Sequence, residues 1–366
     1  MKPYLQAVGE NEATVMVECD SASAVTVQYG PTTSYGFSAT TASTLKTTGG
    51  TYVHRVRLTG LQANTLYHYR ASQGGATWTA DAAFTTAVPA GTGFRFAFLS
   101  DFQTSGSTPH AKIATRVLNV DRPSVSIYGG DLASDGSDYA KYKSDFFTAE
   151  ELSLIARVPF FACMGNHDGW GQNPQAFFQA PASASGTQAY YSFDYGDVHF
   201  LILNNQVDDS RGSAQYDFAR SDLAATRKTW KIVAAHYPAY SWGSHGSDSD
   251  MQAMTTDIFE PMGVDMVLGG HNHFYQHSLV NGIHHLVISP VGASPPHAGN
   301  LRVRDQVGQR QLLRGVRRLA VDPYPHDLQR RRGRPGFLLS QQEAGGSLRP
   351  ERHRRLLQPD QPRLDR

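Results

Sequence analysis

The 366-residue sequence contains no run of about 18 apolar residues, so it offers no segment that could cross a membrane as a helix. Cysteine is nearly absent, and Cys19 and Cys163 lie in apolar segments far apart in the chain. We therefore expect two buried thiols and no disulfide. Residues 1–6 lack an apolar core followed by a small-residue cleavage site, so the sequence predicts no signal peptide.

Lysine is absent from residues 301–366, which hold 16 arginines and 7 acidic residues, whereas residues 1–300 hold 17 basic and 25 acidic residues. One interpretation of residues 299–366 is a disordered basic arm for a polyanion. Basic arms usually mix lysine with arginine, which argues against nucleic-acid binding. The composition favours another interpretation, a shift of the reading frame near residue 295 that replaced the last strands with arbitrary residues.

Short strands separated by turns fill the first part of the chain. Apolar and polar residues alternate, with the period of half-buried strands, over residues 14–19, 24–29, 52–58 and 65–71. No helical pattern interrupts them. This predicts an all-β sandwich over residues 1–88, followed by a short linker at residues 89–93.

Beyond the linker, apolar strands alternate with segments of helical spacing, which predicts an α/β domain over residues 94–298. With 40% hydrophobic residues, the chain is long enough for two cores. Five of the apolar strands run directly into polar loops, which are residues 100–103, 129–131, 164–168, 236–238 and 269–273.

The loop at 164–168 reads Met-Gly-Asn-His-Asp and combines an amide, an imidazole and a carboxylate, although these residues are also common in simple turns. In an open α/β sheet, ligands bind outside the carboxyl ends of the strands. His271 and His273 are two apart in an extended segment, so both can face the same way. The five loops would place at one rim the side chains of Asp101, Asp131, Asn166, His236, His271 and His273.

These five motifs, in this order, resemble the calcineurin-like metallophosphoesterases. The domain plan resembles the purple acid phosphatases, in which a fibronectin type III-like domain precedes the catalytic one. Residues 58–67 resemble the turn into the tyrosine corner of such a domain, with Tyr67 as the corner residue. The resemblance covers residues 1–295 and implies a two-sheet α/β sandwich with metals at one edge.

The resemblance also implies a dinuclear metal centre and assigns its ligands. Asp131 would bridge the two ions, Asp101 and His273 would complete the first site, and the second site would be completed by Asn166, His236 and His271. Nitrogen and oxygen donors without cysteine suit two divalent or mixed-valence ions of manganese, iron or zinc, and the sequence does not choose among them. A hydroxide held between the metals would be the nucleophile.

Three further residues are predicted to be catalytic. His167 would reach the phosphoryl oxygens or the leaving group, and Asp168 would orient it. His245 lies nine residues after His236, the spacing at which purple acid phosphatases place a substrate-facing histidine. Its loop is polar and rich in glycine, which suits the mouth of a cleft.

The sequence departs from the family at two positions. Purple acid phosphatases have an iron-binding tyrosine three residues after the bridging aspartate, where this chain has Ser134. We therefore expect neither a purple colour nor an obligatory ferric ion. Many other metallophosphoesterases have a metal-binding histidine two residues after the first aspartate, where this chain has Gln103, whose amide oxygen is a further candidate ligand.

The main hypothesis is a hydrolase that cleaves phosphate monoesters as acid phosphatases do, with a small phosphorylated molecule as substrate. Cleavage of phosphodiesters at the same two-metal site is the alternative, and Ser134 and Gln103 favour it. A hypothesis of another class is a catalytically inert protein that attaches to a surface through its N-terminal domain. The resemblance also implies an extracellular or periplasmic location.

Overall fold

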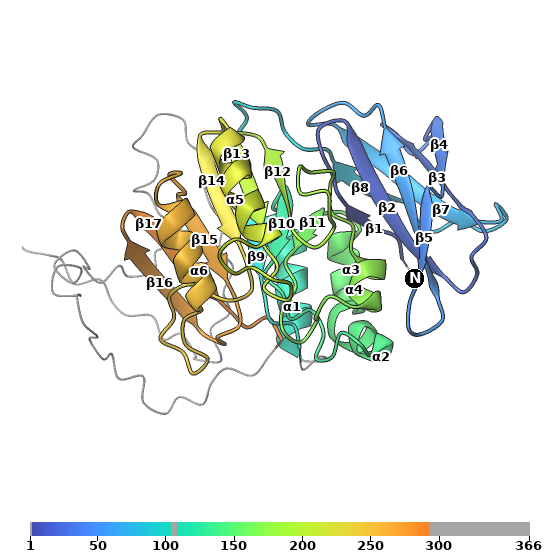
Figure 1. The fold of residues 1–366 in the computed structure, drawn as a ribbon. Helices are drawn as coiled ribbons and strands as arrows, with labels where there is room; N and C mark the ends of the chain where they lie inside the picture. Colours follow the sequence, from blue (N-terminus) through green and yellow to red (C-terminus); the bar gives the residue numbers. More distant parts are fainter. Residues whose placement is uncertain (1, 104–107, 293–366) are drawn as a thin grey trace, which may run out of the picture.

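The computed structural model describes residues 2–103 and 108–292. Its N-terminal part is a sandwich of two four-stranded antiparallel sheets, at the right of Figure 1. In order, the strands of the first sheet are β1 (Tyr4–Gln6), β2 (Glu12–Cys19), β6 (Tyr52–Thr59) and β5 (Ser43–Lys46). Those of the second sheet are β4 (Phe37–Thr40), β3 (Val25–Gly30), β7 (Leu66–Gln73) and β8 (Ala82–Thr85).

The sandwich forms because inward-facing apolar residues of both sheets meet in one core, in which Val15, Val27 and Val56 are fully buried. The hydroxyl of Tyr67 accepts a hydrogen bond from the backbone N–H of Gln62 at 3.1 Å, the contact of a tyrosine corner. The predicted all-β domain is therefore confirmed. Strands β4 and β5 were not predicted, because they are largely exposed and show little apolar alternation.

The second part contains a three-stranded parallel sheet and a six-stranded mixed sheet. In order, the three-stranded sheet consists of β11 (Phe160–Ala162), β10 (Val125–Tyr128) and β9 (Phe96–Leu99). The six-stranded sheet consists of β12 (Tyr191–Tyr195), β13 (Val198–Ile202), β14 (Trp230–Ala234), β15 (Met266–Gly269), β17 (Ile283–Ile288) and β16 (Tyr275–Val280). Parallel strands covered on both faces read as continuous apolar runs, as these do.

Helices cover the outer face of each sheet, as Figure 1 shows. Those on the three-stranded sheet include α1 (Thr108–Arg116), α3 (Ala149–Ile155) and α4 (Gln172–Phe177), with the short α2 (Tyr139–Lys141) nearby. Those on the six-stranded sheet are α5 (Ala214–Ala225) and α6 (Ser249–Met254). π-helical turns extend α1, α2 and α6 over Val117–Asp121, Tyr142–Phe146 and Thr255–Phe259.

The inner faces of the two sheets meet in a core that contains Phe98, Ile127 and Ile232. This arrangement of helices, sheet, sheet and helices confirms the predicted two-sheet α/β sandwich. The helical segment before α3 ends ahead of Thr148, whose hydroxyl caps α3 by accepting the N–H of Glu151 at 3.3 Å. The short helices α4 and α6 were missed, since six residues are too few to show a helical period.

The two domains share a continuous interface. Tyr4 and Met16 of the sandwich belong to the same hydrophobic core as Phe177 of α4, and the hydroxyl of Tyr4 donates to the carbonyl of Phe177 at 2.7 Å. The buried carboxylate of Glu18 accepts a hydrogen bond from Lys143 of the second domain at 2.7 Å. The sandwich therefore rests on the helices of the three-stranded sheet.

The predicted domain boundaries, 1–88 and 94–298 with a linker at 89–93, stay predictions. The predicted linker lies within the segment between β8, which ends at Thr85, and β9, which begins at Phe96. The arginine-rich segment 299–366 lies outside the described residues. Within residues 2–103 and 108–292, no helix combines the length and the apolar character that a membrane crossing needs.

Candidate metal centre

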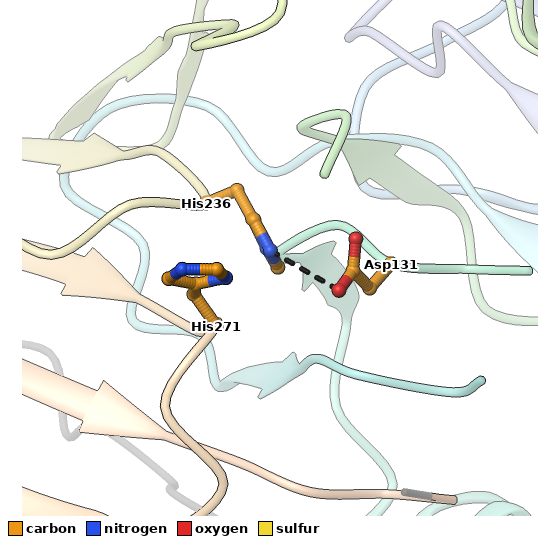
Figure 2. Close-up of side chains that lie close together, drawn as sticks. All are labelled: Asp131, His236 and His271. Carbon is orange, nitrogen blue, oxygen red and sulfur yellow. Dashed lines mark ion pairs between the residues drawn. The ribbon is translucent and has the colours of Figure 1, made fainter. Parts of the chain in front are cut away.

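The polar loops of the second domain meet at the carboxyl ends of its strands. Asp101 follows β9, Asp131 follows β10, His236 follows β14, and His271 and His273 follow β15. Asp131, His236 and His271 each offer one potential ligand atom, and these three atoms lie within 4.8 Å of one another. Figure 2 shows the three side chains converging from separate loops. The topology therefore brings Asp131 close to His271, although 140 positions separate them in the chain (271 − 131).

Asp131 lies at the centre of the cluster and is 1% exposed. Its Oδ1 accepts the backbone N–H of His167 at 2.9 Å, and its Oδ2 lies 3.3 Å from Nε2 of His236. Position 165 has to be glycine, because a Cβ there would lie 2.1 Å from Oδ1 of Asp131. Glycine thus allows the loops 129–131 and 164–168 to pack backbone against carboxylate.

The ring of His236 is fixed by the backbone. Its Nδ1 lies 2.7 Å from the carbonyl oxygen of Gly129, and a carbonyl can only accept a hydrogen bond. Nδ1 therefore carries the proton, and Nε2 is free to face Asp131 and the side-chain oxygen of Asn166, which lies 3.2 Å away. This is the arrangement in which a second hydrogen bond orients a metal-binding histidine.

A second group of side chains lies beside this cluster. Nε2 of His273 is 3.5 Å from Oδ1 of Asp101, and the fully buried Asp101 carboxylate accepts the N–H of His271 at 3.0 Å. Nε2 of Gln103 donates to Oδ2 of Asp131 at 3.0 Å and lies 3.2 Å from Nε2 of His273. Gln103 thus links the central aspartate with the histidine predicted for the first metal.

Three candidate ligands have a left-handed backbone conformation. Their φ angles are 63° at Asp101, 53° at Asp131 and 67° at His271. This conformation is uncommon for residues other than glycine and costs on the order of 1 kcal/mol or more at each position. Among the described residues, eight non-glycine residues have a positive φ, and these three candidate ligands are among them. Backbone strain of this kind often accompanies functional sites.

The cluster perturbs its own titration. Burial raises the pKa of Asp131, but the contacts with His236 and His167 together outweigh burial and lower this pKa below its ordinary value. Burial lowers the pKa of His236, yet Asp131 and Asp101 raise it to about 9. Burial, then His236 and His245, lower the pKa of His271 to about 4. The negative charge of Asp131 and the neutral imidazole of His271 suit a cation, and a bound metal would displace the proton that His236 otherwise holds.

The structure contradicts one predicted contact, that between Asp168 and His167. The buried carboxylate of Asp168 accepts the backbone N–H groups of Gly165 at 2.9 Å and Leu132 at 3.0 Å instead. Nδ1 of His167 lies 3.0 Å from the carbonyl oxygen of Ser134. The physical reason is that buried N–H groups of the two loops need an acceptor, and Asp168 supplies it. Asp168 therefore ties the loops together and does not orient His167.

His167 and His245 lie at the exposed rim of the cluster. Nε2 of His167 is 4.0 Å from Oδ2 of Asp131, and this side chain is 44% exposed. The ring centroid of His245 lies 4.5 Å from that of His271, and its backbone N–H donates to Oδ1 of Asn272 at 3.1 Å. The two histidines thus adjoin different members of the buried cluster and come from separate loops.

Two asparagines support the site and were not predicted. Oδ1 of Asn205 accepts the backbone N–H groups of His236 at 3.1 Å and Tyr237 at 2.8 Å. Asn205 lies in a polar loop after the apolar strand β13, so the same layout that marked the other loops could have found it. Asn272, which holds the loop of His245, was missed because reasoning from the sequence considered only its flanking histidines as ligands.

The donor set fits divalent metal ions. Within the described part of the chain, the carboxylates of Asp101 and Asp131 contact histidines, an amide and backbone N–H groups, with no lysine or arginine. Burying two carboxylates is costly unless positive charge lies beside them, and a bound cation supplies such charge. The side-chain oxygen of Gln103 is also buried and has no hydrogen-bond partner among these residues. Such nitrogen and oxygen donors suit manganese, iron or zinc.

Comparison with known families agrees with this geometry. Residues 94–275 match the family described as Calcineurin-like phosphoesterase, and residues 2–86 match Purple acid Phosphatase, N-terminal domain. The chain therefore belongs to the calcineurin-like metallophosphoesterases. Within that class it combines the phosphoesterase domain with the N-terminal domain of the purple acid phosphatases.

Its curated relatives include purple acid phosphatases. The chain is 28% identical over 239 residues to Purple acid phosphatase 18 of Arabidopsis thaliana, and this match covers 61% of this chain and 52% of that protein. It is 26% identical over 263 residues to Acid phosphatase type 7 of Danio rerio, covering 62% and 57%. The chain thus spans little more than half the length of either relative.

A solved structure shares the fold. It is a purple acid phosphatase from seeds of yellow lupin (Lupinus luteus), with a TM-score of 0.65 and 23% sequence identity. The match covers 80% of this chain and 64% of the lupin chain, and therefore extends over both domains. At this identity the likeness concerns the fold alone.

Proposed function

We propose that this chain hydrolyses phosphate monoesters at a centre of two metal ions. The observation that carries the proposal is the convergence of Asp131, His236 and His271 at the carboxyl ends of strands from both sheets, with Asp101 and His273 beside them. The names of the relatives, purple acid phosphatase and acid phosphatase, support a phosphate ester as the substrate. A small phosphorylated molecule is the proposed substrate class.

The ligands are proposed as follows. Asp131 would be shared by the two ions, and its Oδ2 lies 3.3 Å from Nε2 of His236 and 3.0 Å from Nε2 of Gln103. Asp101, His273 and the amide oxygen of Gln103 would complete the first ion's ligands, and Asn166, His236 and His271 would complete those of the second. When bound, the two ions supply polarisation of the phosphoryl group and an activated water as the nucleophile.

The exposed histidines are proposed to handle the substrate. The carbonyl of Ser134 can only accept, so Nδ1 of His167 carries a proton and its Nε2 stays available to the site. When protonated, Nε2 can donate to a phosphoryl oxygen or to the departing alkoxide. His245, held through its backbone by Asn272, binds the phosphoryl group from the other loop. Asp168 maintains the loop that carries His167.

Hydrolysis of p-nitrophenyl phosphate and bis(p-nitrophenyl) phosphate tests this function. The purified protein is reconstituted with manganese, iron or zinc, and Asp131→Ala serves as the control. We expect the monoester to be cleaved faster and the control to be at least about a hundredfold slower, since a displaced site costs that much. Preference for the diester would indicate a phosphodiesterase at the same centre. Silence on both esters from a folded, metal-loaded protein would refute the hydrolase and favour an inert surface-binding protein.

An extracellular or periplasmic location is also proposed, from the resemblance to the purple acid phosphatases. Fractionation of the source cells, with the activity above as the marker, tests the location. Activity confined to the cytoplasmic fraction would contradict it.

A further inference from the structure

We infer that the N-terminal domain positions His167 through two residues, Thr48 and Asn173. Thr48 lies in the loop between β5 and β6, and Asn173 lies in α4 of the second domain. The inference rests on the proposed function, because that function assigns His167 to phosphoester cleavage. Both are positioning residues, since neither contacts the metal cluster.

Asn173 connects the two domains with all its hydrogen-bonding capacity. Its side chain is completely buried. Oδ1 accepts the backbone N–H of Thr48 at 2.9 Å, while Nδ2 donates to the carbonyl oxygens of Gly136 and Ser137, both at 3.1 Å. Oγ1 of Thr48 also lies 3.1 Å from the carbonyl of Ser137. Thr48 and Asn173 therefore hold residues 136 and 137 by hydrogen bonds, and Thr48 does so from the N-terminal domain.

Residues 134–137, which include the two residues held by Thr48 and Asn173, contact His167 directly. The N–H of Gly136 donates to the carbonyl oxygen of His167 at 2.7 Å. A Cβ at position 136 would lie 1.9 Å from the carbonyl oxygen of Asp168, so the two backbones are in close contact. Two residues earlier, the carbonyl of Ser134 accepts from the His167 ring. Residues 134–137 thus hold both the backbone and the imidazole of His167.

Hydrogen bonds are what define the shape of this segment. Residues 132–137 belong to no helix or strand, so regular backbone bonding does not fix them. Removal of the Asn173 amide leaves the buried carbonyl oxygen of Gly136 without its side-chain donor, while that of Ser137 keeps only Thr48. A buried carbonyl without a donor moves or admits water. Domain association itself does not depend on Asn173, because the Glu18–Lys143 ion pair and the Tyr4 contacts remain. A loss at Asn173 therefore acts on His167.

The test compares Asn173→Ala with Gln172→Ala. Gln172 is the neighbouring residue of α4, and its Nε2 also bonds the N-terminal domain, at 2.9 Å from the carbonyl of Lys46, but it contacts nothing in 134–137. In N173A we expect kcat to fall at least about tenfold, with KM and bound metal little changed, because a small displacement of a catalytic group is costly. Thr48→Val should lower kcat in the same direction, and Q172A should stay within about twofold of wild type.

A double-mutant cycle with His167→Gln separates positioning from general damage. If Asn173 acts through His167, N173A has little further effect in the H167Q background. Losses that multiply in the double variant would overturn the inference, as would equal rates for N173A and Q172A.

A spectroscopic readout keeps this inference separate from the proposed function. The His167 resonance is assigned in histidine-labelled protein by its disappearance in H167Q. We expect N173A to shift this resonance and Q172A to leave it unchanged. If the wild type is inactive but N173A still shifts the His167 resonance, the proposed function is refuted and the positioning contact is retained. If N173A leaves the resonance unshifted, the positioning contact is refuted.

Discussion

Gly165→Ala tests whether the close approach of the loops 129–131 and 164–168 creates the metal centre. The added Cβ would lie 2.1 Å from Oδ1 of Asp131 and 2.4 Å from its backbone nitrogen. Relief requires a shift of roughly 1 Å, because the second contact is with backbone and Oδ1 is itself held by the N–H of His167, so overpacking of this kind costs about 1–3 kcal/mol. A displacement of that size also exceeds the tolerance of about 0.5 Å for a functional constellation. We therefore expect weakened metal binding and an activity loss of roughly a hundredfold.

The assay combines the metal content of the dialysed protein, its thermal unfolding midpoint and the rate with p-nitrophenyl phosphate. Gly171→Ala is the matched control, because a Cβ there meets nothing within 4 Å and its φ of −96° is ordinary for alanine. Gly171 precedes α4 as its N-cap, so its substitution should cost no more than about 1 kcal/mol. A G165A protein that retains both metals and the wild-type rate would refute the argument from loop packing.

Four other predictions follow from the same structure. Gln103→Ala should weaken the binding of one metal by at least about tenfold and Gln103→His should restore it, as measured by calorimetric titration; equal affinities in all three proteins would exclude Gln103 as a ligand. Asp168→Asn should lower the free energy of unfolding by about 2 kcal/mol because several backbone N–H groups lose a charged acceptor, and a loss in denaturant titrations below about 0.5 kcal/mol would show that the carboxylate matters little. Burial lowers the pKa of His199, but its contacts with Asp194 at 2.8 Å and Asp222 at 2.7 Å raise it to about 9. Because the folded-state pKa of His199 is raised above about 6.5, its ion pairs add about 2 kcal/mol to the free energy of unfolding. This stabilisation is complete below pH 6.5 and is lost as pH rises through 9, so His199→Gln should remove that pH dependence from the unfolding profile. Removal of metal by a chelator should lower the unfolding midpoint, since ligand at 100 times its Kd stabilises by about 2.7 kcal/mol, and an unchanged midpoint would contradict a folded-state metal site.

Local pattern in the sequence predicted most of the architecture. Strand alternation before residue 88 and continuous apolar strands after residue 94 indicated the two domains, because burial on one face or two leaves different periods in the sequence. Because ligands of an open α/β sheet bind outside the carboxyl ends of its strands, the sequence placed Asp131, His236 and His271 together. In the structure one potential ligand atom of each lies within 4.8 Å of the others. The fold-class prediction was confirmed because it depended on short stretches and on a general property of parallel sheets, whereas the metal-binding roles of these residues stay predictions.

Other features depended on how distant segments pack. Nothing near Asp168 in the sequence shows that its carboxylate serves buried N–H groups of another loop, so its assignment to His167 was wrong. The contact of Thr48 with Asn173 joins residues 125 positions apart and two domains. The sequence by itself determined the fold class and the residue types gathered at the sheet edge, since these follow from hydrophobic period and strand order. Only the tertiary structure decided which side chains support them, because a buried hydrogen-bond partner is chosen by packing and leaves no periodic signal.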